Sequence, residues 1–258
     1  MSPVAVPLAF ITGATSGIGY ATAHALARQG FRLVVCGRDA QRLESLRAEL
    51  AVVTPVHALR FDLGDETEVR AAVASLPLVW QEVDVLVNSA GGAYDYGPVQ
   101  DGNAADWDAM LASNVHGLLY VTHALLPQLP GRGRGHIVNV SSAAGKQAYA
   151  NASVYCATKA AVESLSQSLR LDLLPLGVKV TNIAPGAVET GFSQVRFKGD
   201  AQRAAAVYEG FEPLQADDVA DAIVYAVTRP AHVQIADLVI YPRAQAAVTT
   251  ILRAMTSQ

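Results

Sequence analysis

Cysteine is scarce in this 258-residue sequence, which has only Cys36 and Cys156, both inside regular apolar patterns. That placement favours two small buried thiols in a reducing compartment over a disulfide. Residues 1–9 carry no positively charged segment ahead of an apolar one and run directly into a strand-like stretch, which predicts that there is no signal peptide. Both observations predict a cytoplasmic protein.

Charge is also scarce: 16% of residues are charged, and 23 acidic against 19 basic residues give a net charge of -4. No tract of basic residues stands out, which argues against a nucleic-acid partner. Mean hydropathy is positive, at +0.24, but no stretch reaches the roughly 20 uninterrupted apolar residues that a membrane-spanning helix needs. The run 118–126, for example, is broken by Thr122 and His123 and is followed by Pro127. We therefore expect no membrane partner.

The sequence has no Pro/Ser-rich linker and no internal repeat, and its 51% of hydrophobic residues can build one large core. Short apolar, β-branched runs alternate with amphipathic stretches, the pattern of parallel strands buried on both faces and connected by helices. We predict a single α/β domain over residues 1–258, a doubly wound Rossmann-type fold. Its seven predicted strands are 8–12, 32–36, 56–61, 83–88, 135–140, 178–183 and 238–241.

Two segments between these strands carry further predictions. Leu43, Leu46 and Leu50 recur at helical spacing after Asp39, which is a plausible N-cap. Residues 190–212, between the sixth and seventh strands, are polar and punctuated by glycine. An insertion at that place predicts a substrate lid rather than a second domain.

The first predicted strand runs into a glycine-rich turn and a helix start. Gly13, Gly17 and Gly19 are spaced G-x-x-x-G-x-G, with Thr15, Ser16 and Ile18 between and beside them. Glycines let the main chain approach a pyrophosphate, which can bind the exposed N–H groups at the start of the helix. A purely structural turn is the alternative, but the position at the first strand–helix junction favours a dinucleotide site.

Later strand ends support the same interpretation, because ligands in open parallel sheets bind at the carboxyl ends of strands. Asp62, with Leu63 beside it, follows the third strand, where a carboxylate can accept a hydrogen bond from an adenine amino group. The fourth strand ends in Asn88, and the small residues Ala90 and Gly91 leave room for a cofactor across the strand tips.

The residues after the second strand bear on the choice of cofactor. A carboxylate there favours the free ribose hydroxyl of NAD, whereas a 2′-phosphate requires a cation. Arg38 is the first polar side chain past the strand, and a guanidinium can grip phosphate through two hydrogen bonds. Asp39 would favour NAD if it pointed inward. We predict NADP, with NAD the less favoured cofactor.

Tyr155 and Lys159 are four residues apart, so they share one face of a helix. Tyrosine is a poor base at neutral pH, and a nearby ammonium group is expected to lower its pKa. Ser142 ends the fifth predicted strand and can hold a substrate oxygen while Tyr155 exchanges its proton. The sequence thus predicts an acid–base site beside the glycine turn.

These motifs together, with Pro185-Gly186, resemble the short-chain dehydrogenase/reductase family over essentially the whole chain. The resemblance implies a sheet order of 3-2-1-4-5-6-7 and an assembly of two or four subunits. It implies a catalytic tetrad of Asn114, Ser142, Tyr155 and Lys159. It also implies that Tyr155 and Lys159 help to bind the cofactor. Further cofactor contacts are expected from Pro185, Gly186, Val188 and Thr190.

A narrower resemblance is to the bacterial NADP-dependent 3-hydroxy acid dehydrogenases, carried by 192–200, 229–235 and Leu76-Pro77. It implies a small 3-hydroxy acid substrate, oxidised to a semialdehyde or keto acid, bound by Ser142, Gln147, Tyr149 and Arg196. No metal is expected. Two alternatives stay open: a reductase of other ketones or cyclic metabolites on this scaffold, and a catalytically silent NADP-binding regulator.

Overall fold

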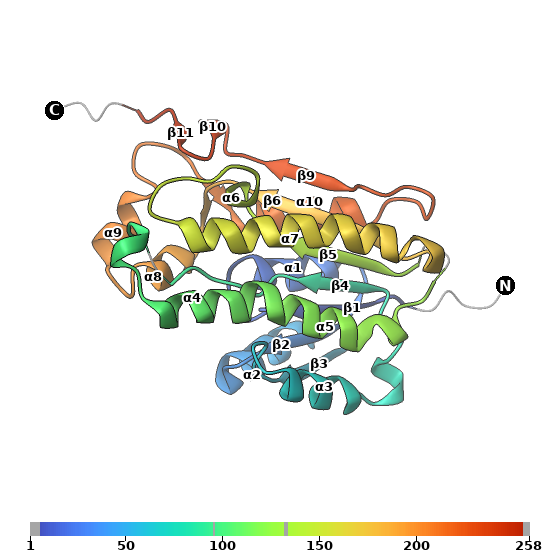
Figure 1. Cartoon of the computed structure of the whole chain (residues 1–258). Coiled ribbons are helices and arrows are strands. Elements are labelled where there is room, and N and C mark those ends of the chain that lie inside the picture. The colour runs from blue at the N-terminus through green and yellow to red at the C-terminus, as the bar shows by residue number, and fades with distance from the viewer. Residues whose placement is uncertain (1–5, 95, 132–133, 255–258) are drawn as a thin grey trace.

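The structure is a computed structural model that describes residues 6–94, 96–131 and 134–254 (Figure 1). Residues 1–5 of the N-terminal stretch discussed above lie outside the described residues. Seven parallel strands form one sheet in the spatial order β3-β2-β1-β4-β5-β6-β9, which confirms the predicted sheet and its order. The strands are β1 (Leu8–Thr12), β2 (Arg32–Gly37), β3 (Val56–Arg60), β4 (Val85–Asn88), β5 (His136–Val140), β6 (Lys179–Pro185) and β9 (Asp237–Ile240).

Helices cover both faces of the sheet because the strands are apolar on both sides. In β1, Ala9 and Ile11 pack into one core cluster with residues of α1, α2 and α10. Leu8 and Phe10 face the opposite way, into a second cluster with residues of α3, α5 and α7. The predicted doubly wound fold is therefore confirmed. These helices are α1 (Gly17–Arg28), α2 (Ala40–Leu50), α3 (Glu66–Ala74), α5 (Gly117–Leu125), α7 (Ser153–Asp172) and α10 (Ala216–Val227).

The predicted start of α2 is confirmed. The Asp39 carboxylate accepts hydrogen bonds from the backbone N–H groups of Gln41 at 3.0 Å and Arg42 at 3.1 Å. Leu43, Leu46 and Leu50 are buried on the face that meets the sheet.

One long helical stretch precedes β5. It consists of α4 (Ala104–Leu111), a π-helical turn (Ala112–His116) and α5. By length and composition alone, Ala104–Gln128 would be long and apolar enough to cross a membrane. In the fold it is a packed helix, because Val121 and Leu125 are fully buried in the second core cluster. The apolar residues of this stretch are interrupted, but its mean hydropathy stays high because the interrupting residues are small or uncharged.

The predicted lid, residues 190–212, contains two short helices, α8 (Phe192–Arg196) and α9 (Ala201–Ala206). A pair of two-residue parallel strands, β7 and β8, connects its two ends. After β9 the chain returns towards the lid and forms a small antiparallel pair. The remaining elements are α6 (Ala143–Lys146), β7 (Val188–Glu189), β8 (Leu214–Gln215), β10 (Gln245–Ala247) and β11 (Thr250–Ile251).

Both cysteines are buried free thiols, as predicted. Burial raises the pKa of the Cys36 thiol well above its usual range. It therefore behaves as a small apolar core residue.

Candidate active site and cofactor cradle

The glycine turn after β1 is packed directly against the chain that leaves β4. Gly13 has a φ of +64°, and a Cβ added to it would lie 2.7 Å from the Cα of Ala90. A Cβ on Gly19 would lie 2.3 Å from the Gly13 carbonyl oxygen. The Thr12 hydroxyl accepts hydrogen bonds from the N–H groups of Ser89 and Ala90, at 3.1 and 3.2 Å. Main chain therefore lines this edge of the sheet, with no space for larger side chains.

The start of α1 suits a diphosphate. Ser16 is its N-cap residue and makes no side-chain capping bond, and the first turn carries no acidic residue. The positive end of the helix dipole is thus not compensated by side chains. Thr15 packs against Gly37, where an added Cβ would lie 2.7 Å from the threonine Cγ2. Ile18 packs on the first core cluster, which fixes the helix start to the sheet.

The end of β2 presents a cation. Arg38 has a side chain that is 71% exposed, and its Nη1 lies 3.6 Å from the Asp62 carboxylate. The Asp39 carboxylate, in contrast, is bonded to the start of α2. Asp62 also accepts a bond from the Gly64 N–H at 2.8 Å. Leu63 packs against α5, where a Cβ added to Gly117 would collide with it.

The side chain of Asn88 is used inside the protein. Its amide donates to the Thr122 hydroxyl at 3.1 Å and to the Asn139 side chain at 2.9 Å, and the residue is buried. These bonds tie the ends of β4 and β5 to α5. The Oδ1 atom of Asn88 is buried and has no hydrogen-bond partner within the described residues.

The predicted contacts after β6 lie at the same edge of the sheet. The Gly186 N–H donates to the Ile240 carbonyl at 2.7 Å, so the Pro185-Gly186 turn stays beside the sheet. The Val188 carbonyl accepts a bond from the Tyr208 hydroxyl at 2.8 Å. Thr190 lies against the start of α1, where an added Cβ on Gly17 would be 3.5 Å from the threonine Cβ.

The fold brings the four predicted catalytic residues together. Asn114 sits in the π-helical turn, a feature that is frequent at functional sites. Its amide donates to the Gly92 carbonyl at 2.9 Å and to the Thr158 hydroxyl at 3.0 Å. Lys159 donates to the Val140 carbonyl at 3.0 Å, two residues before Ser142. Gly91 lies between the Asn114 and Lys159 side chains, where an added Cβ would be 2.8 and 3.6 Å from their polar atoms.

Burial dominates the electrostatics of this pair, contrary to the expectation that lysine lowers the tyrosine pKa. Tyr155 is buried, and loss of hydration raises its pKa well above the usual range, while a hydrogen bond with Ser142 acts in the opposite direction. Burial also lowers the pKa of the Lys159 ammonium to about 8. Arg196 also acts to lower the pKa of Tyr155, but the effect of burial is larger than that of either neighbour.

Arg196 from the predicted lid is surrounded by tyrosines. Its guanidinium carbon lies 4.5 Å from the centre of the Tyr96 ring and 5.6 Å from the rings of both Tyr149 and Tyr155. It donates to the Tyr149 hydroxyl at 2.9 Å. Its Nε is buried and has no hydrogen-bond partner. A cation with an unpaired N–H therefore lies beside the tyrosine that the chemistry needs.

A short-chain dehydrogenase family model matches residues 7–201. The chain belongs to the short-chain dehydrogenase/reductase family. The family predicted from the motifs is therefore confirmed, and the chain is a member of a family of oxidoreductases.

Several characterised members of the family are similar over almost the whole chain. The chain is 46% identical to sulfoacetaldehyde reductase of Chromohalobacter salexigens, covering 92% of this chain and 94% of that protein. It is 41% identical to serine 3-dehydrogenase of Rhizobium radiobacter, covering 90% and 92%. It is 40% identical to the NADP-dependent 3-hydroxy acid dehydrogenase of Salmonella typhi, covering 92% and 96%.

Among solved structures, the closed form of a serine dehydrogenase complexed with NADP+ is similar with a TM-score of 0.89. The two sequences are 38% identical, and the alignment covers 96% of this chain and all of that chain. The fold is therefore shared over almost the whole chain.

The family motifs do not reveal every residue at the site. Tyr96 carries no sequence signal. Phe192, whose ring centroid is 5.6 Å from that of Tyr155, lies in the segment 192–200 that carries the narrower resemblance but was not predicted as a site residue. Gln147, a predicted substrate residue, is exposed and accepts a bond from the Val248 N–H at 3.4 Å. Within the described ranges, no group of three or more His, Cys, Asp or Glu side chains could hold a metal ion.

Proposed function

We propose that this protein is an NADP(H)-dependent oxidoreductase that interconverts an alcohol and a carbonyl in a small acidic substrate. The substrate class is a 3-hydroxy acid with its semialdehyde or keto acid, or the corresponding short sulfonate. The observation that carries this proposal is the Arg196 guanidinium beside Tyr155, with a buried Nε that lacks a partner. The named relatives act on serine, 3-hydroxy acids and sulfoacetaldehyde, all of which carry an acidic group.

The choice of NADP is supported by Arg38, an exposed cation at the end of β2, and by the position of Asp39 as a helix cap. NADP supplies or accepts the hydride when bound. The residues that would hold it are in the glycine turn, at the strand ends and in the segment after β6. Asp62 and Leu63 would border the adenine, and the start of α1 would bind the diphosphate.

The residues of the chain carry the proton chemistry. Tyr155 would donate a proton to the carbonyl oxygen during reduction and accept it during oxidation. Ser142 would hold that oxygen. Lys159 would stabilise the phenolate, and Asn114 would hold the loop at Gly92 beside it.

The acidic group of the substrate would bind on the lid side of the site. Arg196 can give a charge-assisted hydrogen bond, with the Tyr149 hydroxyl as a second polar partner. Residues 190–212 would place Arg196 over the reacting carbon, beside the Tyr149 hydroxyl and with Gln147 at the rim. The lid therefore selects the substrate while Tyr155 performs the proton transfer.

We further propose a cytoplasmic homodimer or homotetramer. The two buried free cysteines support a reducing compartment.

The assembly is supported by exposed apolar side chains. Leu171, near the end of α7, and Leu174, just after it, are each 74% exposed and offer apolar contact area to a second copy. Light scattering behind size-exclusion chromatography distinguishes the monomer from either assembly.

The substrate proposal is tested with Arg196→Gln and the control Lys198→Gln. Lys198 is also a cation in the predicted lid, and it donates to Asp106 on α4 at 2.6 Å. A lost charge-assisted bond costs about 1.5–3 kcal/mol, or about 10- to 150-fold in kcat/KM. We expect that loss for serine, 3-hydroxybutyrate and 2-hydroxyethanesulfonate in Arg196→Gln only.

An uncharged secondary alcohol serves as the comparison substrate. If Arg196→Gln reduces kcat/KM equally for charged and uncharged alcohols, the residue only supports the lid. In that case, or if wild-type enzyme prefers the uncharged alcohol, the acidic-substrate proposal is wrong.

A further inference from the structure

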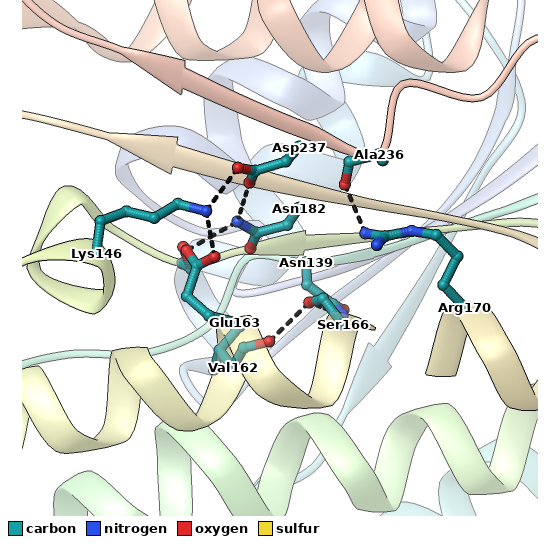
Figure 2. Close-up of polar contacts among 10 residues, drawn as sticks. Asn139, Lys146, Val162, Glu163, Ser166, Arg170, Asn182, Ala236 and Asp237 are labelled. Atoms are coloured by element: carbon teal, nitrogen blue, oxygen red, sulfur yellow. Dashed lines mark hydrogen bonds and ion pairs between the residues drawn. The ribbon is translucent and has the colours of Figure 1, made fainter. Parts of the chain in front are cut away.

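Glu163 is the centre of a polar cluster that includes Lys146, Asn182 and Asp237 (Figure 2). It lies on α7, one turn after Lys159, and its side chain is only 9% exposed. Its carboxylate accepts hydrogen bonds from the Ser141 hydroxyl, the Lys146 ammonium and, at 2.8 Å, the Asn182 amide. Three segments that are distant in the sequence thus converge on one carboxylate.

The cluster extends to the edge strand β9. Lys146 donates to the Asp237 carboxylate at 2.6 Å, and the Asn182 amide donates to it at 2.7 Å. The group comprises two carboxylates and one ammonium, so it carries one excess negative charge. The Glu163 side chain is enclosed, whereas those of Lys146 and Asp237 are 29% and 44% exposed, so the burial cost applies to Glu163 and is offset by its three hydrogen bonds.

The cluster contacts the catalytic residues on two sides. Ser141 precedes Ser142, so its bond to Glu163 fixes the strand end that presents the catalytic hydroxyl. Gly145, in α6, is packed against α7, and an added Cβ there would lie 2.6 Å from the Lys159 carbonyl oxygen and 3.0 Å from the Glu163 Cγ. Glu163 is therefore in contact both with the strand end before Ser142 and with the helix turn that follows Lys159.

The charge of the cluster also reaches Lys159. The groups near the Lys159 ammonium are the Glu163 carboxylate on its own helix, the neutral Asn114 side chain on the π-helical turn and the main-chain carbonyl of Val140 on β5. Lys146 on α6 and Asp237 on β9 act through Glu163. Burial lowers the pKa of Lys159, and Glu163 raises it in opposition.

We propose that Glu163 is a positioning residue that holds the Ser142 strand end, α6 and the Lys159 turn of α7 in register. Lys146 is its counter-ion, and the balance of the two charges sets the proton affinity of the Tyr155–Lys159 pair. This role rests on the proposed oxidoreductase function, because it acts through the residues of that reaction.

The test compares the pH dependence of kcat for alcohol oxidation in three variants. In Glu163→Gln the lost negative charge should shift the midpoint of the alkaline rise to lower pH, on the order of one unit. In Lys146→Gln the unbalanced carboxylate should shift it to higher pH. Lys146→Arg, which keeps the charge, should leave the midpoint where it is in the wild type.

Opposite shifts in the two charge variants would not arise from a merely structural role, which would lower the melting temperature and leave the midpoint unmoved. Unmoved midpoints, or shifts in the same direction, overturn the proposal. Lys146 is 29% exposed, so its variants test the idea even if Glu163→Gln fails to fold. The pH test works with any alcohol that the wild type oxidises, charged or uncharged. Its outcome therefore does not depend on whether the acidic-substrate proposal is correct.

Discussion

Replacing Arg38 with alanine should reduce the use of NADP+ far more than the use of NAD+. A charge-assisted hydrogen bond to the 2′-phosphate is worth about 1.5–3 kcal/mol. Arg38 is 71% exposed and lies 3.6 Å from the Asp62 carboxylate, so the phosphate competes with water and with an exposed ion pair. Exposed pairs contribute up to about 1 kcal/mol. We therefore place the effect at the lower end, about tenfold in kcat/KM with NADP+.

The matched control is Arg42→Ala. Arg42 is 69% exposed, and its Nε lies 3.5 Å from the Asp39 carboxylate at the start of α2. The Arg42→Ala substitution therefore removes the same charge as Arg38→Ala without removing the proposed phosphate contact. Steady-state kinetics with both cofactors should show a change of less than about threefold in this variant. Equal losses with NADP+ and NAD+ in Arg38→Ala would refute the assignment. So would a wild-type preference for NAD+, which would mean that the cap position of Asp39 does not decide cofactor choice.

Two further predictions concern protonation. Tyr155→Phe should lower turnover by about a hundredfold or more, because a positioned acid–base group contributes about 10²–10⁴-fold. Its cofactor affinity, measured by fluorescence titration, should be almost unchanged. A variant that retains more than about a tenth of the wild-type rate contradicts the acid–base role of Tyr155. Burial, together with the charge of Lys179, lowers the pKa of His136 to about 3, so the fold favours the neutral ring. Its stabilising contribution is complete above pH 6.5, the unfolded value, and is lost as pH falls towards 3, about 2 kcal/mol by pH 5. Urea unfolding at pH 7 and pH 5 should show a smaller acid loss in His136→Gln than in the wild type, and equal losses would show that the ring is protonated in the fold.

The sheet and its cofactor edge could be predicted from the sequence because their signals are local. Strands buried on both faces must be apolar throughout, and β1 begins and ends at the predicted residues, 8 and 12. Asp39 and the leucines after it specify the start and the buried face of α2 within twelve residues. The Tyr155-x-x-x-Lys159 spacing needs only one helical turn.

The substrate end of the site was decided by tertiary structure. Arg196 was a candidate in sequence, but one lid cation could not be distinguished from another until the fold paired Lys198 with Asp106 and placed Arg196 between Tyr96 and Tyr149. These side chains are 47 or more positions apart, so their contact depends on how the lid packs over α7.

The degree of burial of each side chain also could not be predicted from the spacing of residues in the sequence. A tyrosine four residues before a lysine predicts a lowered pKa, yet the enclosed site raises the pKa of Tyr155 because the phenolate loses its hydration. Glu163, which looks like a solvated helix residue in the sequence, is enclosed by α6, β6 and its own helix and meets a lysine 17 positions earlier. Local patterns determined which elements form and which residues are proposed to carry the chemistry. The pKa shifts of those residues follow from long-range packing, since desolvation depends on every segment that closes over a group.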